Sequence, residues 1–101
     1  MGRRPFYSEY ANHCWRFYIQ NLTRPVTFKS EAFEKNWESC DAVAKVYTPE
    51  EKNILTSVYS TRDLMGDNVY NAAKKHNVCQ DLVWNLISDA CLRFAKHRGL
   101  V

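Results

Sequence analysis

The stretch Ala73–Ile87, AKKHNVCQDLVWNLI, decides the fold. It reads as the end of one helix, a tight turn and the start of a second helix. Ala73 is small enough for two helices to cross closely, and Asn77 tolerates the left-handed conformation that a tight turn needs. Val83 and Leu86 follow at the spacing of a buried helix face. The stretch therefore predicts two helices that pack against each other around a short connection.

The second of these helices is the longest that the sequence predicts, from about Gln80 to Arg98. Its apolar residues recur at three- and four-residue steps, namely Leu82, Val83, Leu86, Ile87, Ala90, Phe94 and Ala95. Gly99 follows as a C-terminal cap, and Leu100 can fold back onto the helix.

Three helices are expected earlier in the chain. The clearest start signal is Thr48-Pro49-Glu50-Glu51, which supplies a capping hydroxyl, a proline at the first helical position and a glutamate three residues after the cap. A helix is therefore expected from Pro49 to just before Ser60. Ser30 caps a helix over about 31–46, and Pro5 opens a helix that runs to about Asn21.

The fourth helix, which leads into the tight turn, is expected to begin with Asp67 or Asn68 as its cap. The residues of these four helices expected to face inward, by periodicity, are Phe6, Tyr7, Tyr10, Ala11, Cys14, Trp15, Phe17, Tyr18, Phe33, Trp37, Cys40, Ala44, Tyr47, Ile54, Leu55, Val58, Tyr59, Val69, Tyr70, Ala72 and Ala73. The fold expected is all-α, a compact five-helix domain over residues 1–101, with the paired helices at about 67–98 and a long last helix.

Composition limits the class of protein. The chain has 101 residues, of which 46% are hydrophobic, and only three Gly and three Pro, which is typical of one globular domain. No apolar run is long enough to span a membrane, and the opening residues lack the apolar stretch of a secretory signal. We therefore expect a cytoplasmic protein that does not enter a membrane.

Catalytic and metal motifs are absent from the sequence. The four cysteines form no C-x-x-C pair, and the chain has no glycine-rich phosphate loop and no nucleophile elbow. We expect no enzyme activity, no cofactor and no metal site. The net charge of +3 is unevenly distributed, because the first 29 residues, which include Arg3 and Arg4, and the residues from 61 onward are basic while residues 30–60 are acidic.

Residues Val69–Ile87 resemble the helix-turn-helix of phage repressors and of the promoter-reading segment of sigma factors. That resemblance implies that the second helix lies in the major groove of DNA and that the helix before it crosses the backbone. On this basis the residues that would face the groove are Cys79, Gln80, Asp81, Trp84, Asn85 and Ser88. Gln80 and Asn85 carry amides of the kind that form paired hydrogen bonds with adenine. Lys74 and Lys75 would contact phosphates.

Three basic residues near the end of the last helix are further candidates for binding phosphate: Arg93, Lys96 and Arg98. Cations also complement the negative end of the helix dipole there, so the two roles stay open. Asp81 and Trp84 fall on the proposed reading face and are candidates for contact with a protein instead.

The ending Ala95–Val101 and the opening Arg4–Tyr10 are similar to a family of short proteins from Gram-positive bacteria and their mobile elements. This resemblance implies an association with phages or integrated elements, and it carries no assigned function.

Two hypotheses follow. The first is a non-enzymatic DNA-binding transcriptional regulator, acting as a homodimer or beside RNA polymerase. The second is a small protein-interaction module, an inhibitor or adaptor of another regulator, that uses the same fold without reading DNA.

Overall fold

The computed structural model describes residues 5–61 and 64–101, and these form five helices and no strand. The helices are α1 (Ser8–Gln20), α2 (Glu31–Ala44), α3 (Pro49–Tyr59), α4 (Met65–His76) and α5 (Gln80–Arg98). The predicted all-α fold with a long last helix is confirmed. The basic residues Arg3 and Arg4 lie outside the described residues.

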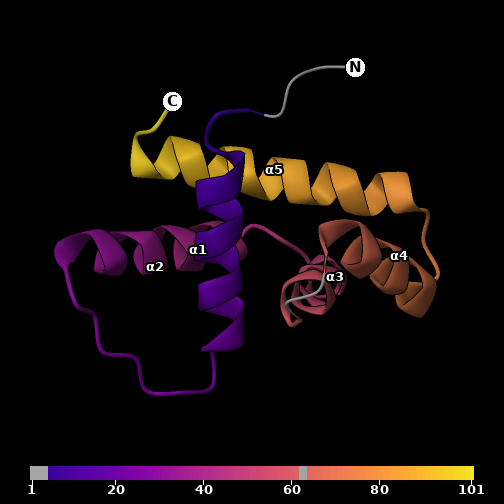
Figure 1. The fold of residues 1–101 in the computed structure, drawn as a ribbon, viewed down its shortest axis with the longest axis horizontal. Coiled ribbons are helices and arrows are strands. Elements are labelled where there is room, and N and C mark those ends of the chain that lie inside the picture. Colours follow the sequence, from indigo (N-terminus) through magenta and orange to yellow (C-terminus); the bar gives the residue numbers. More distant parts are fainter. Residues whose placement is uncertain (1–4, 62–63) are drawn as a thin grey trace.

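The long helix α5 is the element on which the others are arranged, because it contacts each of the other four helices. Figure 1 shows α1 crossing α5 and α2. The helices α3 and α4 pack against each other and against α5, towards the end at which α5 begins. The two ends of α5 therefore have different neighbours, with α1 and α2 over its C-terminal part and α3 and α4 beside its N-terminal part.

The core lies where α1 crosses α5. Trp15 of α1 is only 1% exposed, and its indole Nε1 donates a hydrogen bond to the backbone carbonyl of Ala90 at 3.1 Å. The small side chains of Ala11 and Ala90 are completely buried, and small residues permit a close approach of two helices. Tyr59 of α3 and Phe94 of α5 are also completely buried and complete this centre.

Several helix ends agree with the sequence. The hydroxyl of Ser30 accepts a hydrogen bond from the backbone N–H of Phe33, and Thr48 and Glu51 form a reciprocal capping box that begins α3. Gly99 has a φ of 78°, and the N–H of Leu100 donates to the carbonyl of Ala95 at 2.8 Å. These bonds satisfy backbone groups that a helix terminus leaves without a partner.

The starts of two helices differ from those that the sequence predicts. The helix α1 begins at Ser8 and not near Pro5. Residues 5–8 form a turn before it, in which the N–H of Ser8 donates to the carbonyl of Pro5. The helix α4 begins at Met65 and has no side-chain cap. Asn68 is buried inside α4, where its side-chain oxygen accepts a hydrogen bond from the hydroxyl of Thr61 at 2.7 Å. The amide expected at the helix start thus has a tertiary partner instead.

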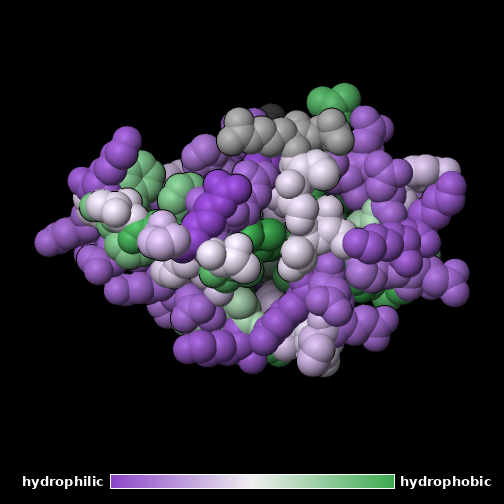
Figure 2. Space-filling model, turned by 90° about the horizontal axis from the view of Figure 1, so that it is seen from below, coloured by the Kyte–Doolittle hydropathy of each residue, from purple (hydrophilic) through white to green (hydrophobic). Residues whose placement is uncertain are grey.

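Some side chains expected to face inward are exposed. They are Phe6, which is 79% exposed, Tyr10, Phe17, Phe33, Tyr70 and Leu82. Periodicity identifies the apolar side of a helix but not how much of that side a neighbouring helix covers. Phe17 still contacts the ring of Trp37 at its edge. Figure 2 shows one face of the molecule, on which hydrophobic surface forms small patches between hydrophilic side chains.

Within the described ranges, the structure has no helix with the length and apolar character needed to cross a membrane.

Asn77 allows a test of the turn between α4 and α5, because it has a left-handed backbone with φ 55° and ψ 48°. Replacing Asn77 with Ala should lower the free energy of unfolding by about 1 kcal/mol, since a side chain without an amide is disfavoured in this conformation. Asn77→Gly should leave stability unchanged or raise it slightly. Urea unfolding of the two variants measures the difference.

The control is Asn53→Ala, at an exposed helical position of α3, where alanine should be neutral or slightly stabilising. Equal stabilities of Asn77→Ala and Asn53→Ala would contradict a left-handed turn at Asn77.

Candidate functional site

The connection between α4 and α5 spans three residues, Asn77, Val78 and Cys79. The N–H of Asn77 donates to the carbonyl of Lys74 at 3.4 Å, and the N–H of Val78 donates to that of Ala73 at 3.0 Å. This pair of bonds closes α4 through its left-handed residue and turns the chain so that α5 can begin at once. The connection is therefore defined by backbone hydrogen bonds.

His76 anchors the end of α4 to α3. Its Nε2 lies 2.8 Å from the hydroxyl oxygen of Ser57, and the side chain is half-buried. The imidazole of His76 is therefore held by a polar partner on the neighbouring helix. The same contact keeps α3 against the helix that leads into the turn.

The first two and a half turns of α5 present an exposed polar strip. It consists of the residues of α5 that the resemblance places towards a groove: Gln80, Asp81, Trp84, Asn85 and Ser88, all of which are exposed. Cys79, which the resemblance places with them, is exposed at the N-cap of α5. The residues between them, Val83, Leu86 and Ile87, are buried, so the inward orientation predicted for these three is confirmed. Trp84 is 36% exposed, with the rest of its surface against the protein.

Lys74 and Lys75 lie beside this strip, in the last turn of α4. Both are exposed, and in the part of the chain that the structure describes neither forms an ion pair. Their charges are available to a ligand at the junction of α4 and α5, where they also complement the helix dipole.

The three basic candidates near the end of α5 do not join this group. Gln80 and Arg93 are 13 residues apart, which is roughly 20 Å along a helix. Arg93 Nε donates to Asp89 Oδ2 at 2.8 Å, and Arg98 Nε donates to Asn36 Oδ1 at 2.7 Å. Of the three, only Lys96 is exposed and without such a partner among the described residues.

Asp89 accepts a second hydrogen bond, from the hydroxyl of Tyr47 at 2.7 Å. Burial acts to raise the pKa of Asp89, but the hydrogen bonds from Tyr47 and Arg93 outweigh it and hold this pKa below the usual value. Burial and the bond to Asp89 raise the pKa of Tyr47. Arg93 and Tyr47 therefore share Asp89 as their acceptor, which joins the loop after α2 to α5.

An apolar groove borders the exposed strip of α5, and helical periodicity did not indicate this groove. This groove, the Trp84 groove, has a volume of about 960 Å³. Its apolar walls come from the segment before α1, from the start of α4 and from α5, namely Pro5, Tyr7, Met65, Trp84, Ile87 and Leu92. These segments are distant in sequence, so only the folded chain brings them together.

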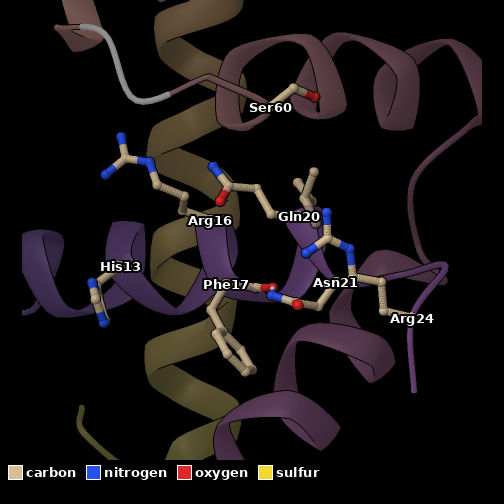
Figure 3. A pocket seen from close by; sticks show the side chains of 8 residues that line it. His13, Arg16, Phe17, Gln20, Asn21, Arg24 and Ser60 are labelled. Carbon is tan, nitrogen blue, oxygen red and sulfur yellow. Dashed lines mark hydrogen bonds between the residues drawn. The ribbon is translucent and has the colours of Figure 1, made fainter. Parts of the chain in front are cut away.

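A second hollow, the Arg16 pocket, lies between α1, the segment that follows it and the end of α3 (Figure 3). Its volume is about 850 Å³, and its lining is mainly polar: His13, Arg16, Phe17, Ile19, Gln20, Asn21, Arg24 and Ser60. His13, Arg16 and Gln20 share one side of α1 at three- and four-residue spacing. That spacing is the only sequence signal for this pocket.

Metal and thiol chemistry have little support in the geometry. Among the described residues, no group of three or more His, Cys, Asp or Glu side chains is placed to hold a metal ion. Burial raises the pKa of Cys14 to about 11 and also raises that of Cys40, so both stay protonated and poorly nucleophilic at neutral pH. Cys79 is an exposed free thiol in the turn.

Comparisons with protein-family models, with curated proteins and with solved structures find no match to this chain.

The contact of Tyr47 with Asp89 predicts a pH-dependent contribution to stability. Tyr47→Phe removes one donor and should lower the free energy of unfolding at pH 7 by about 0.5–1 kcal/mol, a modest value because the Asp89 side chain is 41% exposed. Since the folded pKa of Asp89 is lowered, the contribution is complete above the unfolded pKa of about 3.9 and is lost as the pH falls through the folded value.

Urea unfolding of the wild type and Tyr47→Phe at several pH values measures this difference. Tyr70→Phe is the control, because the Tyr70 ring is exposed and its hydroxyl has no hydrogen bond to other described residues. A difference between wild type and Tyr47→Phe that stays constant down to the lowest pH would contradict the assignment.

Proposed function

We propose that this protein is a non-enzymatic helix-turn-helix protein that binds duplex DNA and regulates transcription. One observation carries the proposal: the first turns of α5 are exposed along Gln80, Asn85 and Ser88, while the opposite side of the same turns is buried against neighbouring helices. A helix that inserts into the major groove of DNA needs one side packed against the protein and the other side exposed to contact bases.

The neighbouring helices support the same proposal. The helices α3, α4 and α5 contact one another in every pairing, and α4 meets α5 through a three-residue connection (Figure 1). In helix-turn-helix proteins the second helix enters the major groove and the first crosses the backbone. We assign these roles to α5 and α4.

Five exposed side chains at the junction of α4 and α5 can then be given a chemical role on DNA. The amides of Gln80 and Asn85 can each donate to and accept from one adenine edge. Asp81 can accept from the amino group of cytosine, although its charge opposes nearby phosphates. Lys74 and Lys75 contact phosphates, which contribute most of the sequence-independent affinity.

Among the basic residues near the end of α5, we retain Lys96 as a second phosphate contact, since Arg93 and Arg98 are engaged within the protein. A homodimer would place two α5 helices on successive major grooves, and contact with RNA polymerase would place a single copy at a promoter. The resemblance to phage repressors, to sigma factors and to a family from mobile elements of Gram-positive bacteria favours these settings.

The Trp84 groove favours a second candidate function, that of a protein-interaction module. Its apolar walls flank the exposed edge of Trp84, and a large aromatic side chain beside a groove is typical of a site that a protein partner occupies. An inhibitor or adaptor would use this face for a regulator and would leave DNA unread.

The first test is fluorescence anisotropy of labelled duplex DNA over a salt series. We expect binding that weakens as salt rises, and we expect Lys74→Gln and Lys75→Gln each to reduce the slope of log K against log salt by about 0.9. Lys35→Gln, at an exposed position of α2, removes the same charge and should leave the slope unchanged. Absence of salt-dependent binding at low ionic strength would sink the proposal.

Sequence reading is tested on a duplex obtained by in vitro selection. Gln80→Ala and Asn85→Ala should each weaken binding to the selected duplex by about 1–3 kcal/mol and leave binding to random duplex nearly unchanged. Equal losses on both duplexes would show that these amides do not read bases.

The second candidate makes a different prediction for Trp84→Ala. If a protein occupies the Trp84 groove, this change should weaken its binding by at least about 2 kcal/mol, as measured with a partner recovered by pull-down. Phe33→Ala, another exposed apolar position, is the control. If Trp84→Ala recovers the same partners as the wild type, and Lys74→Gln and Lys75→Gln lose DNA binding, this candidate is excluded.

A further inference from the structure

The Arg16 pocket is lined by a cationic side chain that has a buried hydrogen-bond donor. Nε of Arg16 is buried, and among the residues that the structure describes it has no hydrogen-bond partner. Buried polar groups in folded proteins nearly always have a partner, and a charged donor is the most costly to leave without one. Among the described residues, Nε of Arg16 therefore lacks the acceptor that a buried charged donor normally has.

Two further cationic or titratable side chains line the same pocket. For His13 and Arg24, as for Arg16, the structure records no side-chain hydrogen bond or ion pair within residues 5–61 and 64–101. No carboxylate is among the described residues that line the pocket. None of the described lining residues therefore carries a negative charge that would neutralise the positive charge of this hollow.

Each of the two amide side chains of the pocket donates one hydrogen bond to the backbone of the protein. Gln20 Nε2 donates to the backbone carbonyl of Tyr59 at 3.0 Å, and Asn21 Nδ2 donates to that of Phe17 at 2.8 Å. The first bond joins the end of α1 to the end of α3 and so holds two walls of the pocket together. Figure 3 shows Arg16, Gln20 and Arg24 extending towards the side of the pocket on which Ser60 lies.

A phosphate group is the ligand chemistry that fits these donors. Guanidinium groups donate several N–H bonds in a fixed fork and match the oxygen atoms of phosphate, whose charge also suits a pocket with two arginines. A volume of about 850 Å³ is in the range of small-molecule sites and exceeds what a single inorganic ion fills.

We propose that the Arg16 pocket binds the phosphate group of a phosphate ester, with Arg16 and Arg24 as the principal donors and His13 at the rim. This site is separate from the exposed strip of α5, so the proposal does not rest on the proposed function. The phosphate can belong to a small phosphorylated molecule or to a nucleic-acid backbone, and the experiment distinguishes these sources.

The test is isothermal titration of the full chain with ribose 5-phosphate, with ribose as the ligand that lacks only the phosphate. We expect binding of ribose 5-phosphate and none of ribose. Arg16→Gln should weaken binding by about tenfold or more, which is the effect of removing one charge-assisted hydrogen bond. Lys35→Gln removes the same charge outside the pocket and should change the affinity by less than about twofold.

A titration with a short duplex completes the design, and circular dichroism checks that Arg16→Gln is folded. If ribose 5-phosphate does not bind but duplex affinity falls in Arg16→Gln, the phosphate is that of nucleic acid and the site stands. If ribose 5-phosphate still binds to Lys74→Gln and Lys75→Gln, its site is the Arg16 pocket and not the junction of α4 and α5. If neither ligand responds to Arg16→Gln in a folded protein, the proposal is overturned.

Discussion

The contact between Trp15 and the backbone of Ala90 is the constraint on which the arrangement depends. A buried indole N–H needs an acceptor, and here it finds the carbonyl of Ala90 in the middle of α5. This bond sets the rotation of α1 on α5, and the contact of Cys91 Sγ with Asn12 Oδ1 at 3.4 Å lies on the same crossing. The turns of α5 that precede this crossing have one side exposed to solvent and the opposite side buried against neighbouring helices.

Much of the fold was readable because its signals are local. A capping box, a residue suited to a left-handed turn and a terminal glycine each depend on four or five consecutive residues, and α3, the turn at Asn77 and the end of α5 follow them. The start of α4 escaped prediction because Asn68 bonds to Thr61 rather than capping its own helix. Exposure of Phe6 and Leu82 escaped because it depends on which helix lies opposite.

Some features of the candidate sites could likewise be predicted from local sequence, and others could not. Helical periodicity was enough to separate Gln80 and Asn85 from buried Val83 and Leu86. The pairing of Arg93 with Asp89 had a signal in the four-residue spacing, whereas the bond of Arg98 to Asn36 joins residues 62 positions apart and had none. The Trp84 groove and the Arg16 pocket are made by segments from different helices, so they exist only in the folded chain.

The exposed strip of α5 has a consequence for how such a protein can change over generations. The opposite side of the same turns, with Val83, Leu86 and Ile87, supplies the packing, while the exposed residues contribute little to it. With the exception of Trp84, most of whose surface lies against the protein, substitutions along the strip therefore cost little stability. Selection can act on these positions almost independently of folding. A lineage built on this frame can exchange its recognition surface one residue at a time while every intermediate remains folded.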